Sequence, residues 1–93
     1  MDQLFVVDWI YSIPSRGVLL SPGVSIEDYE RVESGDEIEL RLPSGKVFRT
    51  RIAGFYHSGK PNSLYHRTWD ILLEQNVTKD DIDIGTEVWL VTP

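Results

Sequence analysis

Two histidines and a short run of aspartates are the side chains of this 93-residue chain best suited to binding a metal. His57 and His66 flank a loop rich in glycine, proline and asparagine. The chain has no cysteine, and residues 41–69 contain no carboxylate, so a metal site there would need acids from distant segments. Residues 80–83, with the sequence DDID, lack the alternating oxygen ligands and the bidentate glutamate of a calcium loop. We therefore expect no metal and no cofactor.

The sequence also carries no pattern typical of a catalytic nucleophile or a phosphate-binding loop. Several serines lie in predicted loops, but neither histidine has the sequence context of a nucleophile elbow. Gly45 and Lys46 are followed by a valine and lack the earlier glycine of a phosphate loop, so we expect no GTP binding. A small β-barrel fills its interior with side chains. These observations predict that the protein has no catalytic residues and is not an enzyme.

The composition is that of one small acidic domain spanning residues 1–93. The net charge is −6, which argues against a general nucleic-acid-binding protein. No apolar run is long enough to span a bilayer, and the N-terminus lacks the basic start of a signal peptide. Because the chain also has no cysteine, we expect a cytoplasmic protein without membrane contact.

Charge is distributed unevenly along the chain. Residues 1–40 hold nine acids and two arginines, giving −7, residues 41–69 hold six cations and no acid, and residues 70–93 carry −5. Either the segments pair in space and neutralise one another, or the basic middle forms a face for phosphate or an acidic partner. The six cations of this middle segment are Arg41, Lys46, Arg49, Arg51, Lys60 and Arg67.

The pattern of apolar and turn residues predicts strands with almost no helix. Strands are expected at residues 4–13, 18–21, 37–42, 46–52, 68–73 and 87–91. One short helical turn is expected near residues 78–82, capped by Thr78, and residues 24–35 are expected to form a polar connection. Five or six short strands without an amphipathic helix are typical of an all-β protein built as a small barrel.

Residues 37–52 give the clearest local prediction, which is a β-hairpin. Apolar and polar residues alternate, and the loop Pro-Ser-Gly fits a tight turn with Gly45 in the left-handed conformation. The expected partners are Leu40 with Phe48, Ile38 with Thr50, Glu39 with Arg49, and Glu37 with Arg51. Part of the basic middle segment would then be neutralised within the hairpin.

Three segments carry motifs of one known family. They are residues 12–21 (SIPSRGVLLS), residues 32–40 (VESGDEIEL), and residues 70–73 with 77–85 (DILL and VTKDDIDIG). In this order they resemble the second domain of elongation factor Tu and related translational GTPases, over about Leu4 to Leu90. The resemblance implies a closed Greek-key β-barrel of about six strands. The chain has no counterpart of the nucleotide-binding and third domains of those factors, so we expect a stand-alone domain.

In those factors the matching domain holds the aminoacyl end of tRNA on one face of its barrel. The matching positions here are about Asp8, Trp9, Tyr11, Thr68 and Trp69. Trp9 and Trp69 depart from the smaller or acidic residues of the family, so we do not carry tRNA binding over. The three aromatic residues either form an exposed patch of the kind that dominates binding interfaces or pack beneath residues 54–66.

We predict a non-catalytic binding module that acts through protein–protein interaction. The expected contacts with the partner protein are Trp9, Tyr11, Thr68 and Trp69. One alternative is an immunity-type inhibitor that neutralises a basic toxin. Another is an RNA- or tRNA-end-binding accessory protein, with phosphate contacts from Arg49, Arg51, Lys60 and Arg67. Pairing of the arginines with Glu37 and Glu39 would favour the protein partner.

Overall fold

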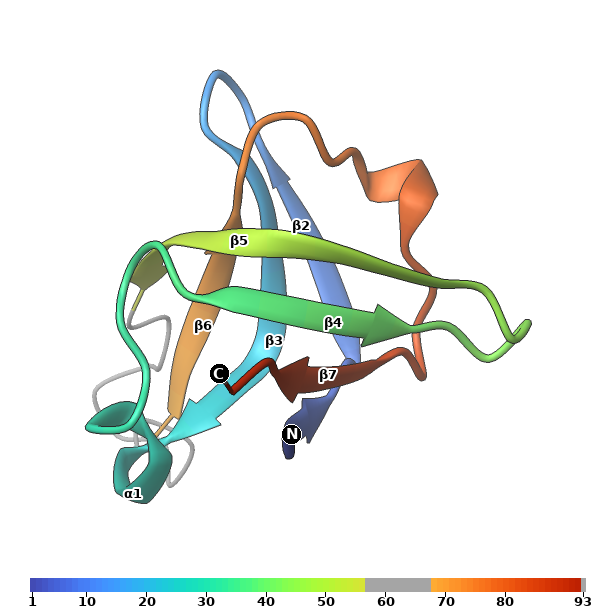
Figure 1. Cartoon of the computed structure of the whole chain (residues 1–93). Coiled ribbons are helices and arrows are strands. Elements are labelled where there is room, and N and C mark those ends of the chain that lie inside the picture. Colours follow the sequence, from blue (N-terminus) through green and yellow to red (C-terminus); the bar gives the residue numbers. More distant parts are fainter. Residues whose placement is uncertain (57–67, 93) are drawn as a thin grey trace.

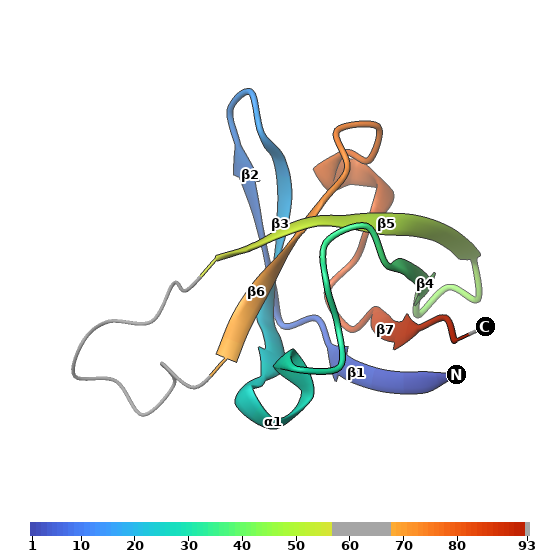
Figure 2. The ribbon, with the colours of Figure 1, turned by 60° about the vertical axis from the view of Figure 1, so that its left-hand side comes forward.

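The computed structural model describes residues 1–56 and 68–92 (Figure 1). Within these residues, seven strands form one antiparallel sheet in the order β1-β7-β4-β5-β6-β3-β2. The sheet curls into a half-barrel, as Figures 1 and 2 show from two sides. The strands are β1 (Asp2–Val6), β2 (Trp9–Ile13), β3 (Gly17–Ser25), β4 (Glu37–Arg41), β5 (Val47–Tyr56), β6 (Thr68–Leu73) and β7 (Glu87–Leu90). The all-β prediction is confirmed, whereas the count of about six strands becomes seven.

The additional strand arises because the predicted strand 4–13 is divided. The amide of Val7 donates to the Thr86 carbonyl at 2.8 Å, beside β7, and the amide of Asp8 donates to the Ser21 carbonyl at 2.9 Å, in β3. The chain therefore passes from the side of β7 to the side of β3 between Val7 and Asp8. Within the described residues, β1 pairs with β7 alone and β2 with β3 alone, so the two halves lie at opposite ends of the strand order.

The described part of the chain has two short helical turns, where at most one was expected. The 3₁₀ turn η1 (Lys79–Asp81) lies at the predicted place, and the Asp81 carboxylate accepts hydrogen bonds from the amide and hydroxyl of Thr78 at 2.9 and 3.1 Å. The helix α1 (Ile26–Tyr29) lies in the connection predicted to be irregular. Ser25 caps α1 by accepting from the Asp28 amide at 3.2 Å, which satisfies a free donor at the helix start.

The β4–β5 hairpin has the predicted register. Its partners are Leu40 with Phe48, Ile38 with Thr50, Glu39 with Arg49, and Glu37 with Arg51. The loop closes through Leu42, whose amide donates to the Lys46 carbonyl and whose carbonyl accepts from the Gly45 amide, both at 2.9 Å. Gly45 has φ 96°, the left-handed conformation that glycine adopts without steric cost. Both the strand alternation and the turn prediction are therefore confirmed.

The hydrophobic core lies inside the curl of the sheet. Fully buried side chains come from β3, β4, β5, β6 and β7, among them Leu20, Leu40, Ile52, Ile71 and Val88. Val77 and Ile82 reach the same core from the connection between β6 and β7, which therefore forms part of the wall. No helix among residues 1–56 and 68–92 is both long and apolar enough to cross a membrane.

Two strand edges face the connection formed by residues 74–86. Among the strands that the structure describes, β2 has one neighbour, β3. β5 pairs with β4 over residues 47–51 and with β6 over 52–56, so its first half likewise has a described strand on one side only. Surface hollows follow both edges beside this connection. These hollows offer space to a ligand.

Candidate binding site

Trp9 and Tyr11 form an exposed aromatic pair on the outer face of β2. Their exposed fractions are 53% and 47%, and their rings meet edge to face with centroids 6.5 Å apart. Ile10 lies between them in sequence and points into the core. The strand alternation thus turns both rings outward, as the prediction of an aromatic patch required.

Trp69 lies apart from this pair and faces the core. It lies on the same face of β6 as the buried residues Ile71 and Leu73, and its ring stacks on Tyr29 of α1 at 4.8 Å. Tyr29 also meets Phe55 edge to face at 5.2 Å. Thr68 begins β6 and is half-buried. The structure therefore joins two of the three predicted aromatic residues and places the third in a separate cluster under α1.

Ile84 and Lys79 were not predicted as site residues. Together with Trp9 and Ile10 they line a hollow of about 230 Å³ beside the unpaired edge of β2. Ile84 is 56% exposed. The sequence carries no signal for this exposure, because it depends on how residues 74–86 lie against β2.

A second hollow, of about 320 Å³, continues along the same edge of β2. Ile13 and Pro14 line it on one side, and Val77 and Thr78 line it on the other. The Gln75 side chain also lines it and donates to the Ser15 carbonyl at 2.9 Å. The two hollows lie beside opposite ends of β2, so they follow the strand along its length.

The arginines of the hairpin are paired with its acids. Arg49 contacts Glu39 at 3.2 Å and Glu37 at 3.5 Å, and Arg41 contacts Glu39 at 2.7 Å. The Glu39 side chain is only 10% exposed. The hydrogen bond from Arg41 holds the pKa of Glu39 below its usual value; a second bond from Arg49 adds to this, and burial opposes it. These carboxylates neutralise both arginines internally.

Arg51 makes a different contact from the one its register suggested. It stands opposite Glu37, but its guanidinium donates to the Gly35 carbonyl at 2.8 Å. Lys60 and Arg67, the other two predicted phosphate contacts, lie outside the described residues. Of the four predicted phosphate contacts, the structure describes Arg49 and Arg51. Each of these arginines already has a partner within the protein.

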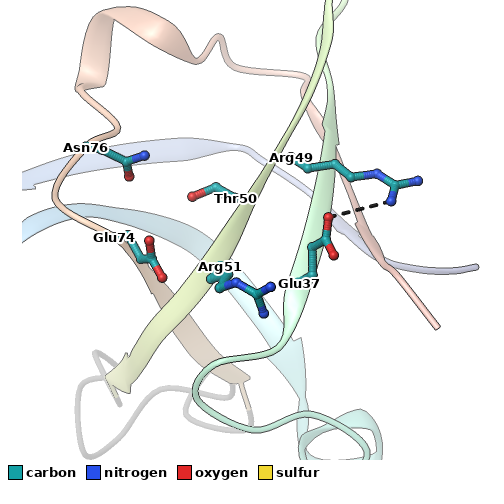
Figure 3. A pocket seen from close by; sticks show the side chains of 6 residues that line it. All are labelled: Glu37, Arg49, Thr50, Arg51, Glu74 and Asn76. Atoms are coloured by element: carbon teal, nitrogen blue, oxygen red, sulfur yellow. Dashed lines mark ion pairs between the residues drawn. The ribbon is translucent and has the colours of Figure 1, made fainter. Parts of the chain in front are cut away.

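A polar hollow of about 220 Å³ lies beside the first half of β5 (Figure 3). Its wall consists of Glu37, Arg49, Thr50, Arg51, Glu74 and Asn76. The charges of Arg49 and Arg51 are balanced by those of Glu37 and Glu74. The hollow therefore has no net positive charge that would favour an anionic ligand. The Thr50 hydroxyl is buried and has no hydrogen-bond partner among residues 1–56 and 68–92.

Asp81 is the other acid whose pKa lies below its usual value. The cause is the hydrogen bond from the Thr78 backbone amide, followed by that from the Thr78 hydroxyl. Such capping stabilises the start of η1 and accounts for the shift without any ligand. Within the described residues, no group of three or more histidines, cysteines or acids could hold a metal ion, and His57 and His66 lie outside them.

No family model, curated protein or solved structure matches this chain.

Proposed function

We propose that this protein is a non-catalytic binding domain whose partner is another protein and whose contact surface is centred on Trp9 and Tyr11. The observation that carries the proposal is the outward pair of aromatic rings, each about half exposed and in mutual contact. Exposed Trp and Tyr are the residue types that most often dominate protein interfaces, because burying a large rigid ring costs little conformational entropy. Ile84 extends the same apolar surface across the neighbouring hollow.

The internal pairing of the arginines supports a protein partner over RNA. A phosphate that approached Arg49 would compete with Glu37 and Glu39, which contact it at 3.5 and 3.2 Å. The net charge of −6 would also repel a nucleic acid at long range. The aromatic surface is therefore available to a partner without breaking an existing ion pair.

The proposed framework for this surface is a closed barrel of six strands, with β1 and β2 acting as one bent strand. The hydrogen bonds of Val7 to Thr86 and of Asp8 to Ser21 support it, since they join the two ends of the strand order. The motif resemblance to the second domain of elongation factor Tu-like GTPases implies the same barrel. The absence of cysteine and the acidic composition support a cytoplasmic location.

The test is to recover partner proteins on the immobilised chain and to measure the affinity of a recovered partner by calorimetry. We expect Trp9→Ala to weaken binding by about 2 kcal/mol. Val47→Ala is the matched control, because Val47 is an equally exposed apolar residue on the hairpin, at 52%. Binding should also change little between low and high salt.

A double variant, Arg49→Ala with Arg51→Ala, separates this proposal from RNA binding. The proposal is wrong if the double variant abolishes binding while Trp9→Ala retains it. A steep loss of affinity with salt, with a log–log slope of about −0.7 per phosphate contacted on a single strand, would point to RNA instead.

A further inference from the structure

We propose that the polar hollow beside the first half of β5 binds a small zwitterion, a free α-amino acid. Its wall is the one drawn in Figure 3, formed by Glu37, Arg49, Thr50, Arg51, Glu74 and Asn76. This site is separate from the aromatic pair on β2, and the inference does not depend on the proposed protein partner. The observations behind it are a buried hydroxyl without a partner, two unpaired side chains beside it, and charges of both signs.

The Thr50 hydroxyl is the observation that points most directly to a ligand. Thr50 is only 7% exposed, and its hydroxyl has no hydrogen-bond partner among residues 1–56 and 68–92. Figure 3 shows its side chain pointing from β5 toward the segment that carries Glu74 and Asn76. A buried polar group without a partner lowers the stability of a protein, so such groups are rare in native structures. A ligand in the hollow supplies the missing partner.

Glu74 and Asn76 bring further unpaired groups to the opposite wall of the hollow. Both residues are exposed and lie just after β6. Neither side chain forms a hydrogen bond or an ion pair within the described part of the chain. A carboxylate, an amide carbonyl and a hydroxyl can all accept hydrogen bonds, and an ammonium group has several N–H donors. The ammonium group of the ligand therefore belongs between Thr50 and these two residues.

Arg51 and the backbone of Arg49 offer donors to a carboxylate. The Arg51 guanidinium donates to the Gly35 carbonyl at 2.8 Å and has further N–H groups free for a ligand. The Ile52 amide donates to the Asp36 carbonyl at 3.0 Å, on the side of β4. Amides alternate in direction along an antiparallel strand, so the Arg49 amide, three residues earlier, faces away from β4. That direction is the side of the hollow, because β5 pairs with β6 only from Ile52 onward.

The charges of the wall favour a ligand that carries both signs. Arg49 is already paired with Glu37 and Glu39. Arg51 and Glu74 have no ion-pair partner among the described residues, and a free α-amino acid carries one charge for each of them. The hollow measures about 220 Å³, below the range of about 300–1,000 Å³ usual for drug-sized ligands, so the ligand has to be small.

The first experiment titrates the isotope-labelled full-length protein with each of the standard L-amino acids and follows its backbone amides by NMR. We expect saturable shifts at residues 49–51 and 74–76 for at least one small amino acid, with a dissociation constant of about 1 mM or lower. Its N-acetyl derivative lacks the ammonium group and its carboxamide lacks the carboxylate, so each should bind roughly tenfold or more weakly. No saturable shift with any amino acid, or equal binding of either derivative, would overturn the proposal.

Two charge-removing variants locate the site. Glu74→Gln removes the carboxylate that faces the ligand's ammonium group, so it should weaken binding by roughly tenfold or more. Glu30→Gln makes the same change at an exposed glutamate that follows α1 and is no part of the wall, so it should leave the affinity unchanged. Equal affinities of the two variants would contradict the site, and thermal melts of both verify that they fold.

Thr50→Val separates a binding role of the hydroxyl from a structural one. The variant keeps the shape of the side chain and loses a hydroxyl that has no partner in the described part of the chain, so it should melt no lower than the wild type. It should nevertheless bind the amino acid roughly tenfold more weakly, whereas Thr50→Ser, which keeps the hydroxyl, should stay close to the wild-type affinity. A stable Thr50→Val variant with unchanged affinity would overturn the proposal.

Discussion

The outer face of the β4–β5 hairpin and the outer face of β2 differ in how completely their side chains are paired. On the hairpin, Arg41 and Arg49 both contact Glu39, and Arg49 also reaches Glu37. On β2, the large side chains are Trp9 and Tyr11, whose rings contact each other edge to face. The cations of the hairpin suggest a binding surface when only the sequence is considered. In the structure, Arg41 and Arg49 on this charged face are paired with carboxylates.

The difference between the two faces is one of energy as well as geometry. A ligand that binds the hairpin arginines has to replace the ion pairs that they already form. Each new exposed ion pair with the ligand would in turn contribute only about 0–1 kcal/mol of binding free energy. A ligand at β2 removes apolar surface from water, at about 25 cal/mol per Å². Apolar burial is therefore the larger source of affinity, and it is available at β2.

Exchange of Trp69 for alanine is expected to have the largest effect and to separate the two tryptophans that the sequence grouped together. Trp69 stacks on Tyr29 and packs against the core, so Trp69→Ala should cost about 2–3 kcal/mol of stability, somewhat less than for a fully buried aromatic residue. Trp9→Ala should change stability by no more than about 0.5 kcal/mol, because the ring is half exposed. Urea unfolding of both variants measures the difference, and equal losses would contradict the division.

Thr50→Val is expected to have a smaller effect of the opposite sign. The Thr50 hydroxyl is buried with no partner in the described part of the chain, and the residue is 7% exposed. A side chain of the same shape without the hydroxyl should therefore stabilise the protein by about 1 kcal/mol. Thr86→Val is the matched control, because the Thr86 hydroxyl donates to the Asp83 carbonyl at 2.6 Å and its loss should destabilise. A destabilised Thr50→Val would show that the hydroxyl is bonded in solution.

Features fixed by neighbouring residues were predictable from the sequence. The register of the β4–β5 hairpin follows from the alternation of residues 37–42 and from a loop that ends in Gly45, and both lie within one short segment. The short turn at η1 likewise follows from Thr78 and Asp81, three residues apart. In each case the interactions that decide the structure lie within a few residues of one another.

Features decided by distant segments were not predictable. The division of strand 4–13 depends on Thr86 and Ser21, which bind Val7 and Asp8 from different parts of the chain. The family resemblance grouped Trp69 with Trp9 and Tyr11, but the stacking of Trp69 on Tyr29 of α1 places it against the core. Ile84 was missed because its exposure depends on how the connection between β6 and β7 lies against β2.

The smallest expected effect concerns the pH dependence of the charged face. The pKa of Glu39 is lowered in the folded protein, chiefly by its hydrogen bond from Arg41, from an ordinary value of 4.5. A lowered pKa stabilises the folded state at pH values above 4.5, and this contribution disappears as the pH falls through the folded pKa. Glu39→Gln should therefore melt below the wild type at neutral pH, and the difference should shrink steadily below pH 4.5.

Glu37→Gln is the control for this measurement, because Glu37 is more exposed and contacts Arg49 at the longer distance of 3.5 Å. Its melting temperature should stay closer to that of the wild type throughout. The Glu39 variant should still lose stability in acid, since Asp81, with a pKa lowered by the Thr78 amide, titrates in the same direction. A gap between wild type and Glu39→Gln that stays constant from neutral to acid pH would mean that the ion pairs of the hairpin do not stabilise the fold. The hairpin arginines would then be available to an acidic partner, and the contrast between the two faces would be lost.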